Sequence, residues 1–158
     1  MPVYPTRMSW LDGNEDSPAS LAAVLQARPA LLERFETFYD TLCDSEAVPV
    51  RTRELCRLRI AAIHGCEAEW NEASGIGADD RQAIASNALQ DFSDAERAAL
   101  DLAEALPFNH HGLRDEQVAA VRTHLGEAGT VALMTQCAFF DVVCRWKLTF
   151  NVQTEANP

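Results

Sequence analysis

The chain has 158 residues, 47% of them hydrophobic, and a formal net charge of −11 from 13 basic and 24 acidic side chains. This length and composition predict one globular domain with its own core, and they exclude a globally disordered chain. The acidic balance argues against nucleic acid or anionic membranes as partners, because both bind basic surfaces.

The hydropathy pattern predicts neither a membrane span nor a secretory signal. The most apolar stretch, residues 131–143, is interrupted by Thr135, Gln136 and Asp141 and is shorter than the roughly 18 apolar residues that a span needs. Residues 1–20 have no apolar centre. In a chain without such a signal, the five cysteines are expected to be reduced thiols and the protein to be cytoplasmic.

Helical patterns recur along the chain, and period-two alternation is nearly absent. The first half is expected to contain an irregular segment 1–16, a short helix capped by Ser17, helices over about 29–43 and 51–63, a break at His64-Gly65, and a short helix from Cys66. The second half is expected to contain a helix over 79–86, a helix from the Ser93–Glu96 capping box to Leu106 stopped by Pro107, a loop over 109–112, a helix over 114–125 ended by Gly126, and a long helix over about 130–151. The sequence therefore predicts a single all-α domain, residues 1–158, with about seven or eight helices.

The last predicted helix is apolar over most of its circumference, whereas a surface helix should show a polar face. It is expected to be the central core helix, a subunit interface, or both. Cys137 and Cys144 share one face of it, but two helical turns separate them by about 10 Å, so they cannot bridge each other. Core packing is the expected role of both thiols.

The most informative segment is the predicted helix over 51–63 with the turn that follows it. It holds Arg53-Glu54-Leu55, then Gly65-Cys66 twelve residues after the glutamate, then Glu67, Glu69 and Trp70. Here the sequence resembles the carboxymuconolactone decarboxylase family, which includes alkylhydroperoxidase D and peroxidase-related proteins. The resemblance covers roughly residues 20–152. It implies an alkylhydroperoxidase D-like fold and a homo-oligomer, which could be a dimer, trimer or hexamer.

The chain also departs from that family's pattern. Redox-active members carry a CxxC pair and a histidine four residues later, whereas this chain has Cys66, then Glu69 and Ala73 at the other two positions. The resemblance therefore implies a peroxidase-related antioxidant oxidoreductase that is one-Cys at best. In that cycle a peroxide oxidises Cys66 to a sulfenic acid, and an external thiol restores it.

Physical chemistry gives each candidate site residue two readings. Cys66 at a helix N-terminus favours a thiolate, although an ionised Glu69 should oppose it and leave a weak thiolate; otherwise Cys66 is a small buried residue. Glu54 is either an active-site carboxylate or the partner of a neighbouring arginine, and Glu69 is either a functional acid or solvated. His64 is either a base for Cys66 or Glu54, or it is bonded to the last carbonyls of its helix. Trp70 either lines a pocket or fills the core.

Two other functions remain open from the sequence. Glu54 and Glu69 could be the acid and base of a non-redox decarboxylase or lactone-handling enzyme. Alternatively, the chain is a catalytically silent oligomeric binding protein. The substrate is expected to be a small molecule, which the arginines at 51, 53, 57 and 59 could attract if it is anionic. No cofactor or metal is expected, since no fingerprint of either is present and no matching ligand surrounds His110 and His111.

Overall fold

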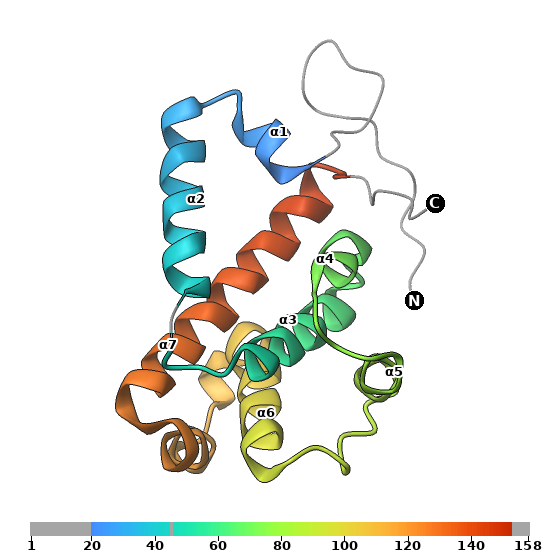
Figure 1. Cartoon of the computed structure of the whole chain (residues 1–158), viewed down its shortest axis with the longest axis vertical. Coiled ribbons are helices and arrows are strands. Elements are labelled where there is room, and N and C mark those ends of the chain that lie inside the picture. The colour runs from blue at the N-terminus through green and yellow to red at the C-terminus, as the bar shows by residue number, and fades with distance from the viewer. Residues whose placement is uncertain (1–19, 45, 153–158) are drawn as a thin grey trace.

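The computed structural model describes residues 20–44 and 46–152 and contains only helices and loops over those ranges (Figure 1). The elements are α1 (Leu21–Leu25), α2 (Pro29–Cys43), α3 (Val50–His64), α4 (Glu67–Glu72), α5 (Ala78–Ser86), α6 (Asp94–Phe108), the 3-10 turn η1 (His110–Gly112) and α7 (Asp115–Thr149). The predicted all-α architecture with seven or eight helices is confirmed. The irregular segment 1–16 and the helix start at Ser17 lie outside the described residues.

Local sequence signals set most of the boundaries. Pro29 is the first residue of α2, and Gly65 ends α3 in the left-handed conformation, with φ of 65°. Ser93 and Glu96 form the predicted capping box of α6. The expected stop before Pro107 is wrong, because α6 continues to Phe108 and the Asn109 amide still bonds the Ala105 carbonyl. A proline in the last turn therefore does not end this helix.

Helix α7 combines the two helices predicted on either side of Gly126. That glycine has φ of 68° and ψ of −174°, so the helix is kinked there and the second arm begins earlier than Thr130. At Gly129 the linker between α2 and α3 comes so close that an added Cβ would lie 2.7 Å from the Ala47 carbonyl oxygen. The kink and this close approach fix where the second arm lies against α3.

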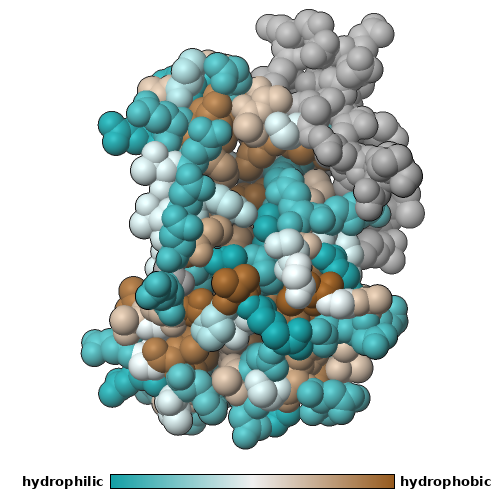
Figure 2. Space-filling model, in the orientation of Figure 1, coloured by the Kyte–Doolittle hydropathy of each residue, from teal (hydrophilic) through white to brown (hydrophobic). Residues whose placement is uncertain are grey.

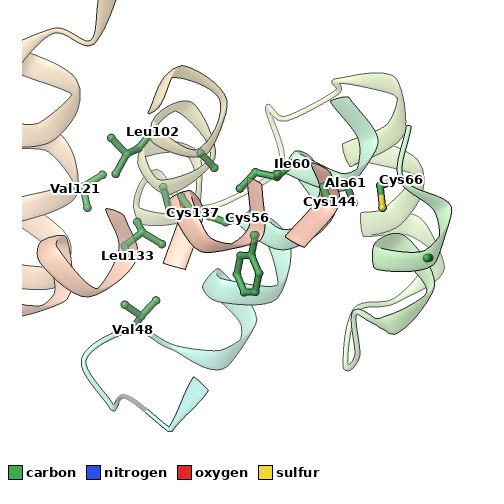
Figure 3. Packing of buried hydrophobic residues seen from close by; sticks show 14 residues of the cluster. Val48, Cys56, Ile60, Ala61, Cys66, Leu102, Val121, Leu133, Cys137 and Cys144 are labelled. Atoms are coloured by element: carbon green, nitrogen blue, oxygen red, sulfur yellow. The ribbon is translucent and has the colours of Figure 1, made fainter. Parts of the chain in front are cut away.

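The main core lies where α3, α6 and α7 pack together, as Figure 3 shows. It includes Cys56 and Ile60 from α3, Leu102 from α6, and Leu133 and Cys137 from α7, each with 0% exposure. The α1–α2 hairpin packs on the C-terminal part of α7 (Figure 1), and Tyr39 of α2 also packs against the main core. Helix α7 thus has the core role that its apolar sequence predicted.

Helix α7 is also the one described helix that is long and apolar enough to cross a membrane. It has 35 residues and a best window of mean hydropathy 1.2, of which 44% is buried inside the protein. The core helix of a soluble protein meets the same criteria, and the packing of α7 against α3 and α6 is of that kind.

Candidate active site

A fully buried carboxylate, Glu69, lies at the centre of the candidate site. Arg57 Nε of α3 donates to Glu69 Oε1 at 2.5 Å, and Lys147 Nζ of α7 donates to Glu69 Oε2 at 2.6 Å. Glu69 has 0% exposure, so the alternative in which it is a solvated helix residue is wrong. Burying a carboxylate is tolerable only when cations and hydrogen bonds compensate its charge, and these two residues supply both.

A second carboxylate closes this arrangement toward solvent. Glu72, one turn after Glu69, lies 3.0 Å from Arg57 Nη2 and 2.6 Å from Lys147 Nζ, and its side chain is 54% exposed. We call Arg57, Glu69, Glu72 and Lys147 the ion cluster. It joins α3, α4 and α7 around one buried charge.

Glu54 lies beside the ion cluster but has its own partners. Its carboxylate is 3.0 Å from Arg53 Nε and 3.6 Å from Arg57 Nη1, and it accepts a hydrogen bond from the Ser74 amide. The predicted pairing with neighbouring arginines is therefore present, although the side chain is buried rather than on the surface.

The four arginines of α3 are all neutralised by carboxylates within the protein. Arg51 pairs with Asp80 and Glu96, and Arg59 pairs with Glu104, while Arg53 and Arg57 pair as described above. The prediction that this cluster attracts an anionic substrate is not supported by the geometry, since each guanidinium already has a carboxylate partner.

Cys66 precedes α4 directly and is buried, with 2% exposure. The pKa of the Cys66 thiol is lowered, and the largest cause is a hydrogen bond with the Cys144 thiol of α7. Burial and the charge of Glu69 act in the opposite direction, while the backbone amide of Glu69 and the charge of Lys147 favour the thiolate. The charge of Glu69 thus opposes ionisation of Cys66 as expected, but the pKa of Cys66 is still lowered, because Cys144 and Lys147 favour the thiolate.

The remaining thiols have different surroundings. Cys56 and Cys137 are fully buried and hydrogen-bonded to each other, which together with burial raises the pKa of Cys56 well above its usual range. Cys43 bonds to the Tyr39 hydroxyl, and burial raises its pKa as well. Cys66 is therefore the described thiol whose environment favours ionisation.

Two predicted site residues lie elsewhere. His64 Nε2 is 2.7 Å from Asp141 Oδ1 and its ring packs on Phe108, so it contacts α7 and α6 rather than Cys66. The prediction that His64 is a base for Cys66 or Glu54 therefore has no contact to support it. Trp70 packs against the main core and against a second buried cluster that includes Leu55 and Ile84, and the Arg81 guanidinium lies 5.5 Å from its ring centroid. This packing corresponds to the core-filling alternative for Trp70.

The two adjacent histidines, His110 and His111, lie in η1 on the surface, where their rings contact each other. No group of three or more His, Cys, Asp or Glu side chains in residues 20–44 and 46–152 is arranged to hold a metal ion.

A cavity of about 240 Å³ adjoins the ion cluster, and Figure 2 shows this face hollowed between α2 and α4. Its polar wall includes Glu69, Glu72, Lys147 and Tyr39, and its apolar wall includes Phe35, along with Leu21 and Val143. Burial raises the pKa of Tyr39, so its phenol keeps its proton at neutral pH. Trp70 does not line this cavity.

The sequence interpretation missed Lys147, Tyr39 and Cys144 as site residues, and it considered Arg57 only as one of four arginines that could attract an anionic substrate. One signal could have found Lys147, because it is the only lysine of the chain and it lies between the apolar residues Trp146 and Leu148. A charge among apolar residues needs a buried partner or an exposed position. No comparable signal marks Cys144, whose seven-residue spacing from Cys137 suggests ordinary core packing.

In comparisons with known proteins, no family model and no curated protein matches the sequence, whereas solved structures do. An uncharacterised peroxidase-related protein from Ralstonia eutropha JMP134 with an alkylhydroperoxidase AhpD core is similar, with a TM-score of 0.68 and 20% identity over 85% of this chain and 75% of that chain. A protein of unknown function from Agrobacterium tumefaciens, a suggested antioxidant defence protein AhpD, has a TM-score of 0.77 and 17% identity over 85% and 97% of the two chains.

A third similar structure is a cysteine-to-alanine variant of the debrominase Bmp8 in complex with 2,3,4-tribromopyrrole. Its TM-score is 0.70, with 18% identity over 85% of this chain and 76% of that chain. The fold of this chain is therefore alkylhydroperoxidase D-like, as the resemblance implied. Because one of these proteins is a debrominase, the fold alone does not give the reaction.

Proposed function

We propose that this chain is a thiol-dependent, peroxidase-type oxidoreductase in which Cys66 reduces a small hydroperoxide. The observation that carries the proposal is the placement of Cys66 directly before α4 and beside Cys144 and Lys147, because these neighbours favour the thiolate, which is the nucleophile in such reactions. The Cys66 sulfur interacts electrostatically with Glu69 and Lys147, and these two side chains line the cavity. Cys66 itself is 2% exposed and does not line the cavity, so Glu69 and Lys147 are the side chains that connect the thiol to it.

In the proposed reaction, the Cys66 thiolate attacks the distal oxygen of the hydroperoxide. The O–O bond breaks, the sulfur becomes a sulfenic acid, and the alkoxide leaves and takes up a proton to give an alcohol. Tyr39 and Lys147 line the cavity and carry N–H or O–H groups that can donate hydrogen bonds to the departing oxygen. This assignment replaces Glu54 and His64 as the proton-handling groups that the sequence suggested.

The geometry favours this proposal over the non-redox alternative. Glu54 and Glu69 are both paired with Arg57, and Glu69 also with Lys147, so the two carboxylates are held as buried ion pairs. An acid–base pair for decarboxylation needs carboxyl oxygens that are free to contact the substrate, and those of Glu54 and Glu69 are already bound to cations of the protein. The catalytically silent binding protein is the alternative that the experiment below distinguishes.

The test compares two thiols within the same protein. The full chain is treated with increasing cumene hydroperoxide, then denatured and alkylated, and the remaining free Cys66 and Cys56 are quantified by peptide mass spectrometry. We expect Cys66 to be lost at least tenfold faster than Cys56, because the pKa of the former is lowered and that of the latter is raised. Equal rates would overturn the proposal and favour the silent protein.

We also propose that the chain assembles with itself through α2 and the facing side of α7. Helix α2 has no fully buried residue, and its Leu31 and Phe38 are 48% and 45% exposed. Phe38 packs on Phe139 of α7, and Val142, three residues later, is also exposed, so the apolar side chains are continuous across both helices. A second copy is a partner that would cover this face.

Light scattering tests the assembly. We expect a mass of at least twice 17.4 kDa at micromolar concentration, and a lower mass for Phe38→Asp. A wild-type mass near 17.4 kDa would contradict it.

The cytoplasmic location remains part of the proposal, because all five cysteines are free thiols in the structure and a reducing compartment keeps them so.

A further inference from the structure

Cys66 and Cys144 form a thiol pair that the sequence did not predict. Cys66 comes from the turn between α3 and α4, and Cys144 comes from the second arm of α7. Their thiols are hydrogen-bonded, and both residues belong to the main core cluster. Figure 3 shows the two residues beside each other, next to Ala61. The fold therefore brings a second sulfur to Cys66 although Glu69 occupies the CxxC position.

The chain offers a direct comparison in its second thiol pair. Cys56 and Cys137 lie in the middle of α3 and α7, so a bond between them would have to draw two packed helices together. Cys66 lies between two helices, in a non-helical backbone conformation with φ of −89° and ψ of 89°. Its position can adjust with less disturbance of helical hydrogen bonds. The polar wall of the cavity adjoins this pair through Glu69 and Lys147.

We propose that Cys144 is the resolving thiol of Cys66, and that the two form a reversible intramolecular disulfide. This inference rests on the proposed function, because the peroxide is the oxidant. The thiol of Cys144 attacks the sulfur of the Cys66 sulfenic acid, the S–OH bond breaks, and the hydroxyl leaves as water with the proton of Cys144. An external dithiol then reduces the disulfide and becomes oxidised itself. The cycle thus uses two cysteines, in contrast to the one-Cys cycle that the sequence predicted.

The hydrogen bond between the two thiols supports both steps. It stabilises the Cys66 thiolate before oxidation, and it keeps the pKa of Cys144 raised, so that Cys144 stays protonated while Cys66 is the nucleophile. After oxidation, the same proximity places the Cys144 sulfur next to the electrophilic one. The pair therefore has distinct attacking and resolving members.

Peptide mapping of the oxidised wild-type protein tests the inference. After treatment with one equivalent of cumene hydroperoxide and alkylation without reduction, we expect a disulfide-linked peptide pair that contains Cys66 and Cys144 and has lost two hydrogen atoms. Tryptic cleavage leaves Cys137 and Cys144 in one peptide, so a second cleavage before Asp141 is needed to separate them. The matched variant Cys137→Ser should form the same disulfide, and Cys144→Ser should instead leave a sulfenic acid that dimedone traps at Cys66.

Two results would overturn the inference, and they are distinguishable from failure of the proposed function. If peroxide oxidises wild-type Cys66 but dimedone traps it while Cys144 stays free, the pairing is wrong and the peroxidase proposal stands. If peroxide does not oxidise Cys66, the peroxidase proposal fails, and the same protein is treated with diamide, which accepts two hydrogens from a thiol pair. A Cys66–Cys144 disulfide then supports the pairing, and its absence overturns it. Both results come from the wild-type chain, so neither depends on the folding of a variant.

Discussion

Lys147 Nζ lies 2.6 Å from Glu69 Oε2, and the two side chains are 4% and 0% exposed. Lys147 belongs to the last turn of α7 and Glu69 to the short helix α4, so this contact joins the end of α7 to the helix that follows Cys66. Removing one partner leaves the other charge buried and unpaired. A single substitution is therefore expected to lower the free energy of unfolding more than replacing both residues by uncharged ones.

Replacing Glu69 by Gln should destabilise the fold. The amide cannot neutralise Arg57 and Lys147, and a broken buried pair costs about 3–5 kcal/mol. Urea denaturation of the variant measures the loss, and Glu67→Gln, an exposed glutamate on the same helix, is the matched control with an expected change within about 0.5 kcal/mol. A loss of less than about 1 kcal/mol for Glu69→Gln would show that the ion cluster does not stabilise the fold as described.

A double variant tests the pairing itself. Glu69→Gln combined with Lys147→Met removes both charges, so its free energy of unfolding should be lowered by less than the sum of the two single losses. Coupling of about 0.5–3 kcal/mol is expected for residues in contact. Additive losses would contradict a direct interaction between Glu69 and Lys147.

Gly129→Ala tests the close approach of the α2–α3 linker to α7. The added Cβ would lie 2.7 Å from the Ala47 carbonyl oxygen and 2.6 Å from Leu125 Cβ, so backbone must shift. We expect a loss of about 1–3 kcal/mol in thermal or urea unfolding. Gly77→Ala is the control, because no atom lies within 4 Å of its added Cβ, and it should stay within about 0.5 kcal/mol of wild type.

Arg51→Ala should have a small effect that depends on pH. A hydrogen bond from Arg51 lowers the pKa of Asp80; for Glu96, burial acts upward, but hydrogen bonds from Ser93 and Arg51 outweigh it and the pKa is lowered. Groups with a lowered folded pKa stabilise the fold above their unfolded values, about 3.9 and 4.3, and lose this contribution as pH falls through the folded values.

Since Arg51 is half-exposed, the loss at pH 7 should be below about 1 kcal/mol, and it should be smaller at about pH 3, which is below the unfolded pKa values of both carboxyl groups. Unfolding of the variant and wild type at both pH values measures this. A difference that persists unchanged in acid would mean that Arg51 stabilises the fold by packing rather than by its ion pairs.

Cys144→Ala should slow alkylation of Cys66 near neutral pH. The hydrogen bond from Cys144 is the largest influence that lowers the Cys66 pKa, so its removal should move the pH–rate profile of iodoacetamide labelling to higher pH. Each unit of pKa corresponds to about tenfold in thiolate fraction where the group is mostly protonated. Cys137→Ala is the control and should leave the profile of Cys66 unchanged. A profile that moves equally in both variants would indicate a general loosening of the core.

The sequence determined the helices because their signals are local. The periodicity of α2, the glycines at 65 and 126 and the capping box at Ser93 act within a few residues, and the structure places helix boundaries close to each of them. The resemblance at Glu54 and Cys66 pointed to the alkylhydroperoxidase D-like fold, which the structure shows. The role of α7 in the core also followed from its composition alone.

Only the tertiary structure decided the chemistry of the site. Whether Glu69 is solvated or buried depends on Arg57 and Lys147, which reach it from two other helices. The pKa of Cys66 depends on Cys144, which lies far away in sequence and has no local pattern that marks it. Charge compensation and hydrogen bonding act through distances in space, and those distances are set only when α3, α4 and α7 pack together.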